Sequence, residues 1–110
     1  MKTAGLFMEL VATYRKHGWE VRSALLQPAT LAELNAGAAQ GLAGLTIRES
    51  PVDALWFSRP SQQNREAWEL RLVAQTPYAL FETFEPDETE EEREDVKSEM
   101  EARMREYASK

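Results

Sequence analysis

The spacing of apolar residues predicts a helix at the start of the chain. Between Thr3 and His17 the apolar side chains recur at every third or fourth position and form one stripe, which consists of Leu6, Phe7, Leu10, Val11 and Tyr14. A second, short helix is expected to begin at Thr30, because Thr30-Leu31-Ala32-Glu33 has the pattern of a capping box. The Ala- and Gly-rich stretch 36–44 has no periodicity and predicts a mobile connector.

The last quarter of the chain predicts a long acidic helix over residues 87–107. Acidic residues crowd its first turns, and Arg103, Arg105 and Lys110 lie near its end, as the helix dipole favours. Asp87 with Glu90, or Thr89 with Glu92, can form the capping box at its start. The apolar stripe of this helix is narrow and consists of Val96, Met100, Met104 and Tyr107.

Between these helices, apolar and polar residues alternate as they do in β-strands. Residues 19–26 and 45–49 predict one strand each, and three further strands are expected over residues 52–59, 67–74 and 78–84. The expected fold is therefore a single α+β domain over residues 1–110. Its antiparallel sheet has about four strands, arranged as a meander, and an N-terminal and a long C-terminal helix flank it.

The short links between the last three strands predict hairpins and a register. The link between residues 74 and 78 reads QTP, so Ala74 is expected to pair with Tyr78. In that register Leu72 faces Leu80, Trp68 faces Phe84 and Glu82 lies opposite Leu70.

Trp56 and Phe57 raise the main question, because neighbouring residues in a strand point to opposite faces of the sheet. The first face is the expected core under the N-terminal helix and carries Trp56, Trp68, Leu70, Leu72, Leu80 and Phe84. The second face carries Leu55, Phe57, Val73, Ala79 and Phe81, mixed with Asp53, Arg59, Glu69, Arg71 and Thr83.

The second face is more apolar than a solvated face should be. Burying a single Phe contributes about 1.5–3 kcal/mol, so an exposed second face would be costly. Three coverings remain open: the C-terminal helix through its Met-bearing stripe, a second copy of the chain, or another protein.

Composition and charge argue against several classes of function. The net charge is −6, and residues 85–110 hold all of the excess, with eleven acidic and five basic residues. This charge opposes a nucleic-acid partner, because phosphate contacts need basic residues. The chain has no cysteine, which excludes disulfides and thiolate chemistry and fits a cytoplasmic location. The apolar run Leu6-Phe7-Met8 is too short for a membrane span or a signal sequence.

Few residues suggest site chemistry. Glu82 lies on the apolar first face, where burial would raise its pKa, unless it reaches solvent or pairs with an arginine. Arg59, Arg65 and Arg71 lie around the polar link PSQQNR and could bind an anion, although loops are ordinarily polar. His17 is the only histidine and lies where a helix C-terminus favours a cation.

No metal site or cofactor is expected, because the chain lacks a second His, any Cys and a loop of alternating oxygen ligands. The acidic run 88–95 follows helical spacing, which is typical of a solvated helix start.

We therefore expect a cytoplasmic, non-enzymatic protein-interaction or regulatory domain, with a homodimer through the second face as one form of it. The partner would be another protein or a second copy, and neither nucleic acid nor membrane. The expected partner-binding residues are Leu55, Phe57, Val73, Phe81, Met100 and Met104. The alternative is a small-molecule-binding domain or weak enzyme that uses Glu82 with Arg59 or Arg71. A subunit of a larger complex is a third reading, which the sequence does not separate from the first.

Overall fold

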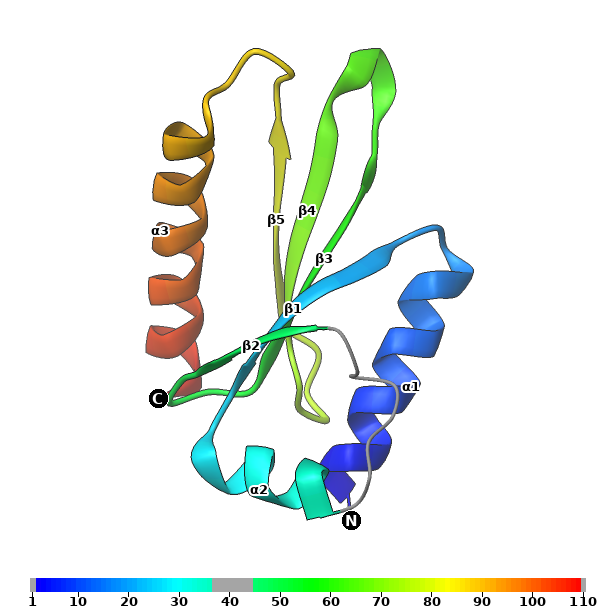
Figure 1. Ribbon diagram of the computed structural model, residues 1–110, viewed down its shortest axis with the longest axis vertical. Helices are drawn as coiled ribbons and strands as arrows, with labels where there is room; N and C mark the ends of the chain where they lie inside the picture. Colours follow the sequence, from blue (N-terminus) through cyan, green and yellow to red (C-terminus); the bar gives the residue numbers. More distant parts are fainter. Residues whose placement is uncertain (1, 37–44, 110) are drawn as a thin grey trace.

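The chain folds into one five-stranded sheet with helices on both sides (Figure 1), and the computed structural model describes residues 2–36 and 45–109. The predicted α+β class is confirmed. The elements, in chain order, are α1 (Lys2–Lys16), β1 (Glu20–Leu26), α2 (Pro28–Ala36), β2 (Thr46–Glu49), β3 (Ala54–Pro60), the 3₁₀ turn η2 (Gln62–Asn64), β4 (Glu66–Leu72), β5 (Ala79–Phe84) and α3 (Glu90–Ala108).

The sheet has one more strand than expected, and one of its strand pairs is parallel. The strand order is β2-β1-β3-β4-β5; β1 and β2 run parallel, and the other neighbours are antiparallel. A parallel pair needs a long crossover, and the segment between β1 and β2 contains α2 and supplies one. The predicted connector 36–44 lies outside the described residues, except for Ala36, which ends α2.

Of the capping boxes predicted for α2 and α3, only the one at α3 forms. The predicted box at Thr30 is wrong, because α2 already begins at Pro28, a residue that suits the first helical position. The Thr30 hydroxyl instead donates to Asp53 Oδ2, 2.8 Å away. At α3 the Thr89–Glu92 box is confirmed: each side chain accepts a hydrogen bond from the backbone N–H of the other.

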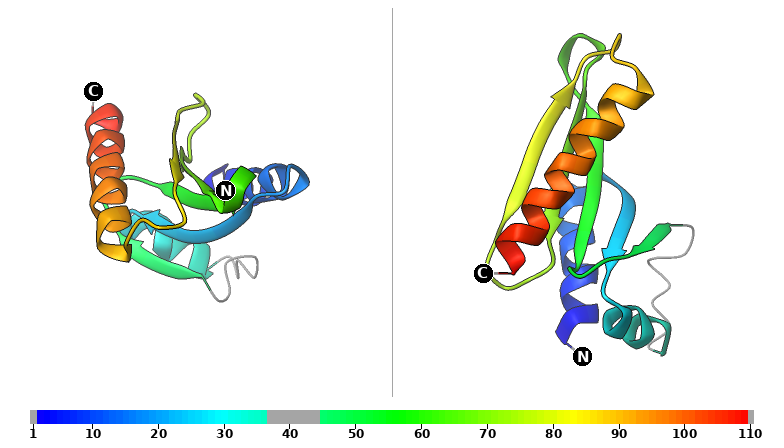
Figure 2. Two further views of the ribbon diagram at one scale, coloured as in Figure 1. Left: turned by 90° about the horizontal axis from the view of Figure 1, so that it is seen from above. Right: turned by 90° about the vertical axis from the view of Figure 1, so that its left-hand side faces the viewer.

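Helices cover both faces of the sheet, but in the opposite assignment to the one expected (Figure 2). The second face packs against α1 and α2 in a core that includes Phe7, Leu10, Val11, Leu34, Leu55, Phe57 and Val73. The first face packs against α3 in a core that includes Trp56, Leu70, Leu72, Met100 and Met104. The expectation that the N-terminal helix covers the first face is therefore wrong. Both faces are apolar, so alternation alone does not determine which helix covers which.

A β-bulge interrupts the expected alternation of β1. Val21 lies opposite Phe57 and Ser23 lies opposite Trp56, which leaves Arg22 as the extra residue between them. Beyond the bulge, Ala24 and Leu26 join the second-face core, whereas Leu25 joins the first-face core. The side chain of Arg22 lies on the first face beside Ser58, to whose Oγ its Nε donates at 2.6 Å.

The register of the last hairpin differs from the prediction by two residues. Leu70 faces Leu80, Trp68 faces Glu82 and Glu66 faces Phe84. The loop is longer than QTP, because the N–H of Leu72 donates to Tyr78 O at 2.9 Å, which leaves residues 73–77 between the two strands. A shift of two residues leaves each side chain on its predicted face.

None of the described helices has a stretch that is both long and apolar enough to cross a membrane.

Candidate functional site

Most of the predicted partner-binding residues lie inside the protein. Leu55, Phe57 and Val73 are buried under α1, and Met100 and Met104 are buried on the other side of the sheet. These five side chains belong to two separate cores and form no common surface. Phe81, in contrast, has 57% of its surface exposed.

The predicted ligand-binding residues do not meet either. Glu82 is exposed and lies opposite Trp68, whose ring belongs to the first-face core. Arg59 lies on the second face, where its guanidinium is 4.7 Å from the centre of the Trp19 ring and donates to His17 O. Arg71 is also on the second face, next to Glu69 and Tyr14. The sheet separates Glu82 from both arginines, so the structure provides no shared pocket for them.

Tyr14 connects α1 to the sheet through two contacts, one aromatic and one polar. Its ring stacks on Phe57 with a centroid distance of 4.0 Å, and its hydroxyl donates to Glu69 Oε2. Burial, followed by this hydrogen bond to Glu69, raises the pKa of Tyr14 to about 12, although Arg71 acts in the opposite direction. The phenol is therefore a structural donor that keeps its proton at neutral pH.

Strand β5 forms one edge of the sheet, and half of its backbone groups have no neighbour strand among the described residues. The N–H of Leu72 donates to Tyr78 O, which makes this opposing pair a hydrogen-bonded one. Because such pairs alternate, Leu80, Glu82 and Phe84 bond to β4, whereas the backbone groups of Ala79, Phe81 and Thr83 point away from it. Figure 2 shows no described helix or strand beyond this edge.

Phe81 projects from this edge on the second-face side. It lies opposite Glu69 on β4, and its ring meets Trp19 edge-to-face at a centroid distance of 6.3 Å. Helix α1 covers the part of the second face formed by β1 and β3, but leaves Phe81 mostly exposed. Phe81 and Met8 are the only large apolar residues counted as exposed among the described side chains. The β5 edge, defined here as Ala79, Phe81 and Thr83, thus combines unpaired backbone with an exposed aromatic ring.

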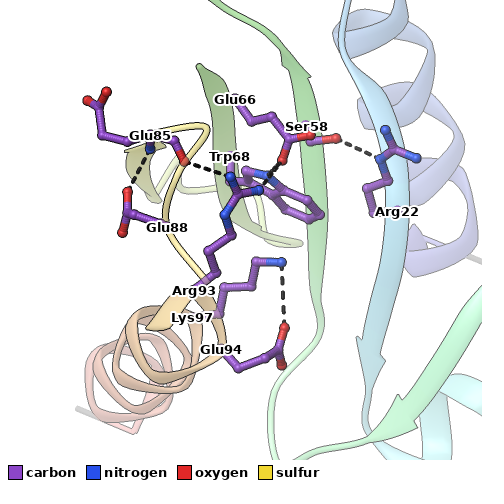
Figure 3. Close-up of polar contacts among 9 residues, drawn as sticks. All are labelled: Arg22, Ser58, Glu66, Trp68, Glu85, Glu88, Arg93, Glu94 and Lys97. Atoms are coloured by element: carbon purple, nitrogen blue, oxygen red, sulfur yellow. Dashed lines mark hydrogen bonds and ion pairs between the residues drawn. The ribbon is translucent and has the colours of Figure 1, made fainter. Parts of the chain in front are cut away.

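On the other side of the sheet, α3 and the strands meet in a network of charges and aromatic rings (Figure 3). Arg93 donates to Glu66 Oε1 at 2.9 Å and to the backbone O of Glu85 at 2.7 Å. The Nζ of Lys97 lies 3.5 Å from the centre of the Trp68 ring, which is a close cation–π contact. These contacts fix the first half of α3 above β4 and β5.

Arginines do gather near the PSQQNR link, but not the three that were expected. Arg22, Arg59 and Arg65 line a depression of about 380 Å³ there, and Arg71 does not. Each of the three has an acceptor within the chain: Ser58 for Arg22, His17 O for Arg59 and Glu85 for Arg65. Sequence reasoning missed Arg22, because it is distant from the link in sequence and comes near it only through the pairing of β1 with β3.

Glu101 is a second residue that sequence reasoning missed. It is buried, and its Oε2 accepts hydrogen bonds from Trp56 Nε1, at 2.8 Å, and from Arg48 Nη2. In the sequence it is one of many glutamates of the last helix, and only its offset by one residue from Met100 suggests a position near the stripe.

Within residues 2–36 and 45–109, no group of three or more His, Cys, Asp or Glu side chains could hold a metal ion. No protein-family model, curated protein or solved structure matches this chain.

Proposed function

We propose that this chain is a protein-interaction domain that forms a homodimer by pairing the β5 edges of two copies. One observation carries the proposal: the outward-pointing backbone groups of Ala79, Phe81 and Thr83 have no partner strand within the described part of the chain, on the edge where Phe81 is 57% exposed. An open edge strand is a template for another strand, and natural domains usually protect such edges with charge, proline or a covering loop. Pairing of the β5 edges leaves α1 in place on the second face. It therefore differs from the dimer expected from the sequence, in which two copies dock through that face.

The edge is self-complementary about Phe81. In an antiparallel pair centred on this residue, Phe81 faces its own copy and Ala79 faces Thr83 of the second copy. All three residues then exchange backbone hydrogen bonds across the two-fold axis. On the other side of the new pair, Leu80 faces Glu82 of the second copy, so no like charges lie directly opposite each other.

The charges of α3 favour the same antiparallel arrangement. The acidic start of α3 lies beside the end of β5, where Arg93 reaches Glu85 O at 2.7 Å. The end of α3, which carries Arg105, lies beside the start of β5, where Tyr107 stacks on Tyr78 with a centroid distance of 3.6 Å. Antiparallel β5 strands therefore keep the two acidic helix starts apart and bring each toward the end of the other helix that carries Arg103 and Arg105.

This proposal predicts the molar mass in solution. Light scattering should give twice the chain mass of 12.5 kDa for the unchanged protein. Phe81→Lys should give a single-chain mass, because it places two like charges on the two-fold axis. Thr83→Pro should do the same, since it removes an outward-pointing N–H without touching the β4 ladder.

Met8→Lys is the matched control, because Met8 is the other exposed large apolar residue and lies on α1, away from the β5 edge. It should leave the dimer intact. A single-chain mass for the unchanged protein at every concentration would overturn the proposal, as would a dimer that survives both β5 substitutions. As part of the same proposal we place this function in the cytoplasm, which the lack of cysteine fits.

A further inference from the structure

A cleft lies between α3 and the strands β1 to β4, on the side of the sheet opposite Phe81. It has a volume of about 340 Å³, which is at the lower end of the range of roughly 300–1,000 Å³ for small-ligand sites. Trp56 and Trp68 line it, with their rings edge-to-face at 6.0 Å. The cleft thus lies between a helix and a sheet and has two aromatic rings in its wall.

The charge of this cleft is opposite in sign to that of the chain. Its charged lining residues are three bases, Arg22, Arg48 and Lys97, and two acids, Glu94 and Glu101. The chain as a whole has 13 basic and 19 acidic residues. Both carboxylates already have basic neighbours: Arg48 donates to Glu101, and Lys97 Nζ is 3.7 Å from Glu94. The excess of one positive charge among the lining residues therefore rests on Arg22, whose own acidic neighbour, Glu20, lies outside the lining.

Two guanidinium groups retain donors for a ligand. Arg48 uses Nη2 for Glu101, and Arg22 uses Nε for Ser58 and places Nη2 3.5 Å from Glu20. A guanidinium carries five N–H donors, so each group has others left. Both side chains are about half exposed, at 50% for Arg22 and 53% for Arg48, and so remain accessible to solutes.

The backbone places two neighbouring residues of β1 on the cleft side of the sheet. Val21 packs in the second-face core, so alternation puts Arg22 on the opposite, cleft side. The bulge between Val21 and Ser23 then keeps Ser23 on that side as well, opposite Trp56. Arg22 and Ser23 therefore both line the cleft.

We infer that this cleft binds a small organic or inorganic oxyanion, with its carboxylate or phosphate group between Arg22 and Arg48. Guanidinium groups bind such anions through charge-assisted hydrogen bonds. The Trp68 ring and the stem of Lys97 provide the apolar wall for the rest of the ligand. This site lies on the first-face side and does not depend on the pairing of β5.

The three tryptophans allow a direct test by NMR of their indole N–H signals. Trp56 and Trp68 line the cleft, whereas Trp19 lies in the core under α1 and serves as an internal reference. Titration of the full chain at constant ionic strength with inorganic phosphate, and separately with citrate, should shift the Trp56 and Trp68 signals along a saturating curve. Saturation by phosphate alone would indicate a phosphate ligand, and saturation by citrate alone would indicate a carboxylate ligand.

Arg22→Gln should weaken this binding about tenfold or more, as expected for a lost charge-assisted contact. Arg103→Gln removes the same charge from the exposed Arg103–Glu99 pair on α3, outside the cleft, and should leave binding unchanged. Shifts that stay linear with both anions, that are equal at Trp19, or that Arg22→Gln does not alter would overturn the inference.

Discussion

Trp56 and Phe57 are adjacent in β3 and are both buried, but each lies under a different helix. Trp56 packs with Met100 and Met104 of α3, whereas Phe57 packs under α1 and stacks on Tyr14. The sheet is therefore the middle layer of three, and its two apolar faces are both satisfied within one chain. The β5 edge of the sheet, at Phe81, has no neighbouring strand among the described residues.

This arrangement predicts that Phe57 and Phe81 differ widely in their contribution to stability. Phe57→Ala should lower the free energy of unfolding by about 3–5 kcal/mol, because it leaves a cavity in a packed core. Phe81→Ala should change the free energy of unfolding of the separated chain by less than about 1 kcal/mol, because the side chain is already mostly in water. Urea denaturation at low protein concentration measures both values, and equal losses would contradict the assignment of Phe57 to the core.

The buried Glu101 should stabilise the packing of α3. Glu101→Ala leaves the buried indole N–H of Trp56 without its acceptor, and so should cost about 1–3 kcal/mol of unfolding free energy. Glu99→Ala is the matched control, because it breaks the exposed pair with Arg103 on the same helix and should cost less than about 0.5 kcal/mol. Similar losses for both variants would show that Glu101 does not hold α3 in place.

Asp53 should be required for docking α2. Its carboxylate accepts from the N–H of Gln27 at 2.9 Å and from the Thr30 hydroxyl at 2.8 Å. Asp53→Ala removes the acceptor of these donors at the helix start and should cost about 1–2 kcal/mol. Faster amide exchange in α2, with α3 unchanged, would accompany this loss. Unaltered exchange in α2 would mean that the helix does not depend on Asp53.

Tyr14 predicts a loss of stability at high pH. An unfolded tyrosine ionises with a pKa near 10, whereas burial and the hydrogen bond to Glu69 raise the pKa of Tyr14 to about 12. Below pH 10 both states keep the proton and the contribution is fully present. Between pH 10 and 12 only the unfolded state releases it, so this contribution is lost as pH rises. Denaturation midpoints from pH 8 to 12 should fall less steeply for Tyr14→Phe than for the unchanged chain. Parallel curves would exclude this role.

Much of the fold could be predicted from the sequence, because the longer helices and the central strands have a clear hydrophobic period. The stripe on α1, the alternation in β4 and the Thr89–Glu92 box are local patterns, and all three describe the structure correctly. The pairing of β1 with β2 could not be predicted, since β2 has only four residues. The choice of face for each helix could not be predicted either, because both faces of the sheet carry enough apolar residues to need a covering helix.

The candidate sites depend on tertiary contacts that no local pattern records. Phe81 was placed on the second face correctly, but its exposure follows from α1 covering only part of that face. Arg22 reaches the cleft through the pairing of β1 with β3, and Glu101 reaches Trp56 from a separate element of the chain. Glu82 lies on the predicted face, yet the face of Arg59 and Arg71 is the other one, so the expected combination does not form.

Amide hydrogen exchange along β5, measured by NMR at increasing protein concentration, tests the proposed dimer most directly. The amides of Leu80, Glu82 and Phe84 bond to β4 within the chain, so their exchange should be slow at every concentration. The amides of Ala79, Phe81 and Thr83 should exchange fast in dilute protein and become slow as the dimer forms. If these three amides exchange fast at all concentrations, the β5 edge does not pair and the proposed homodimer is wrong.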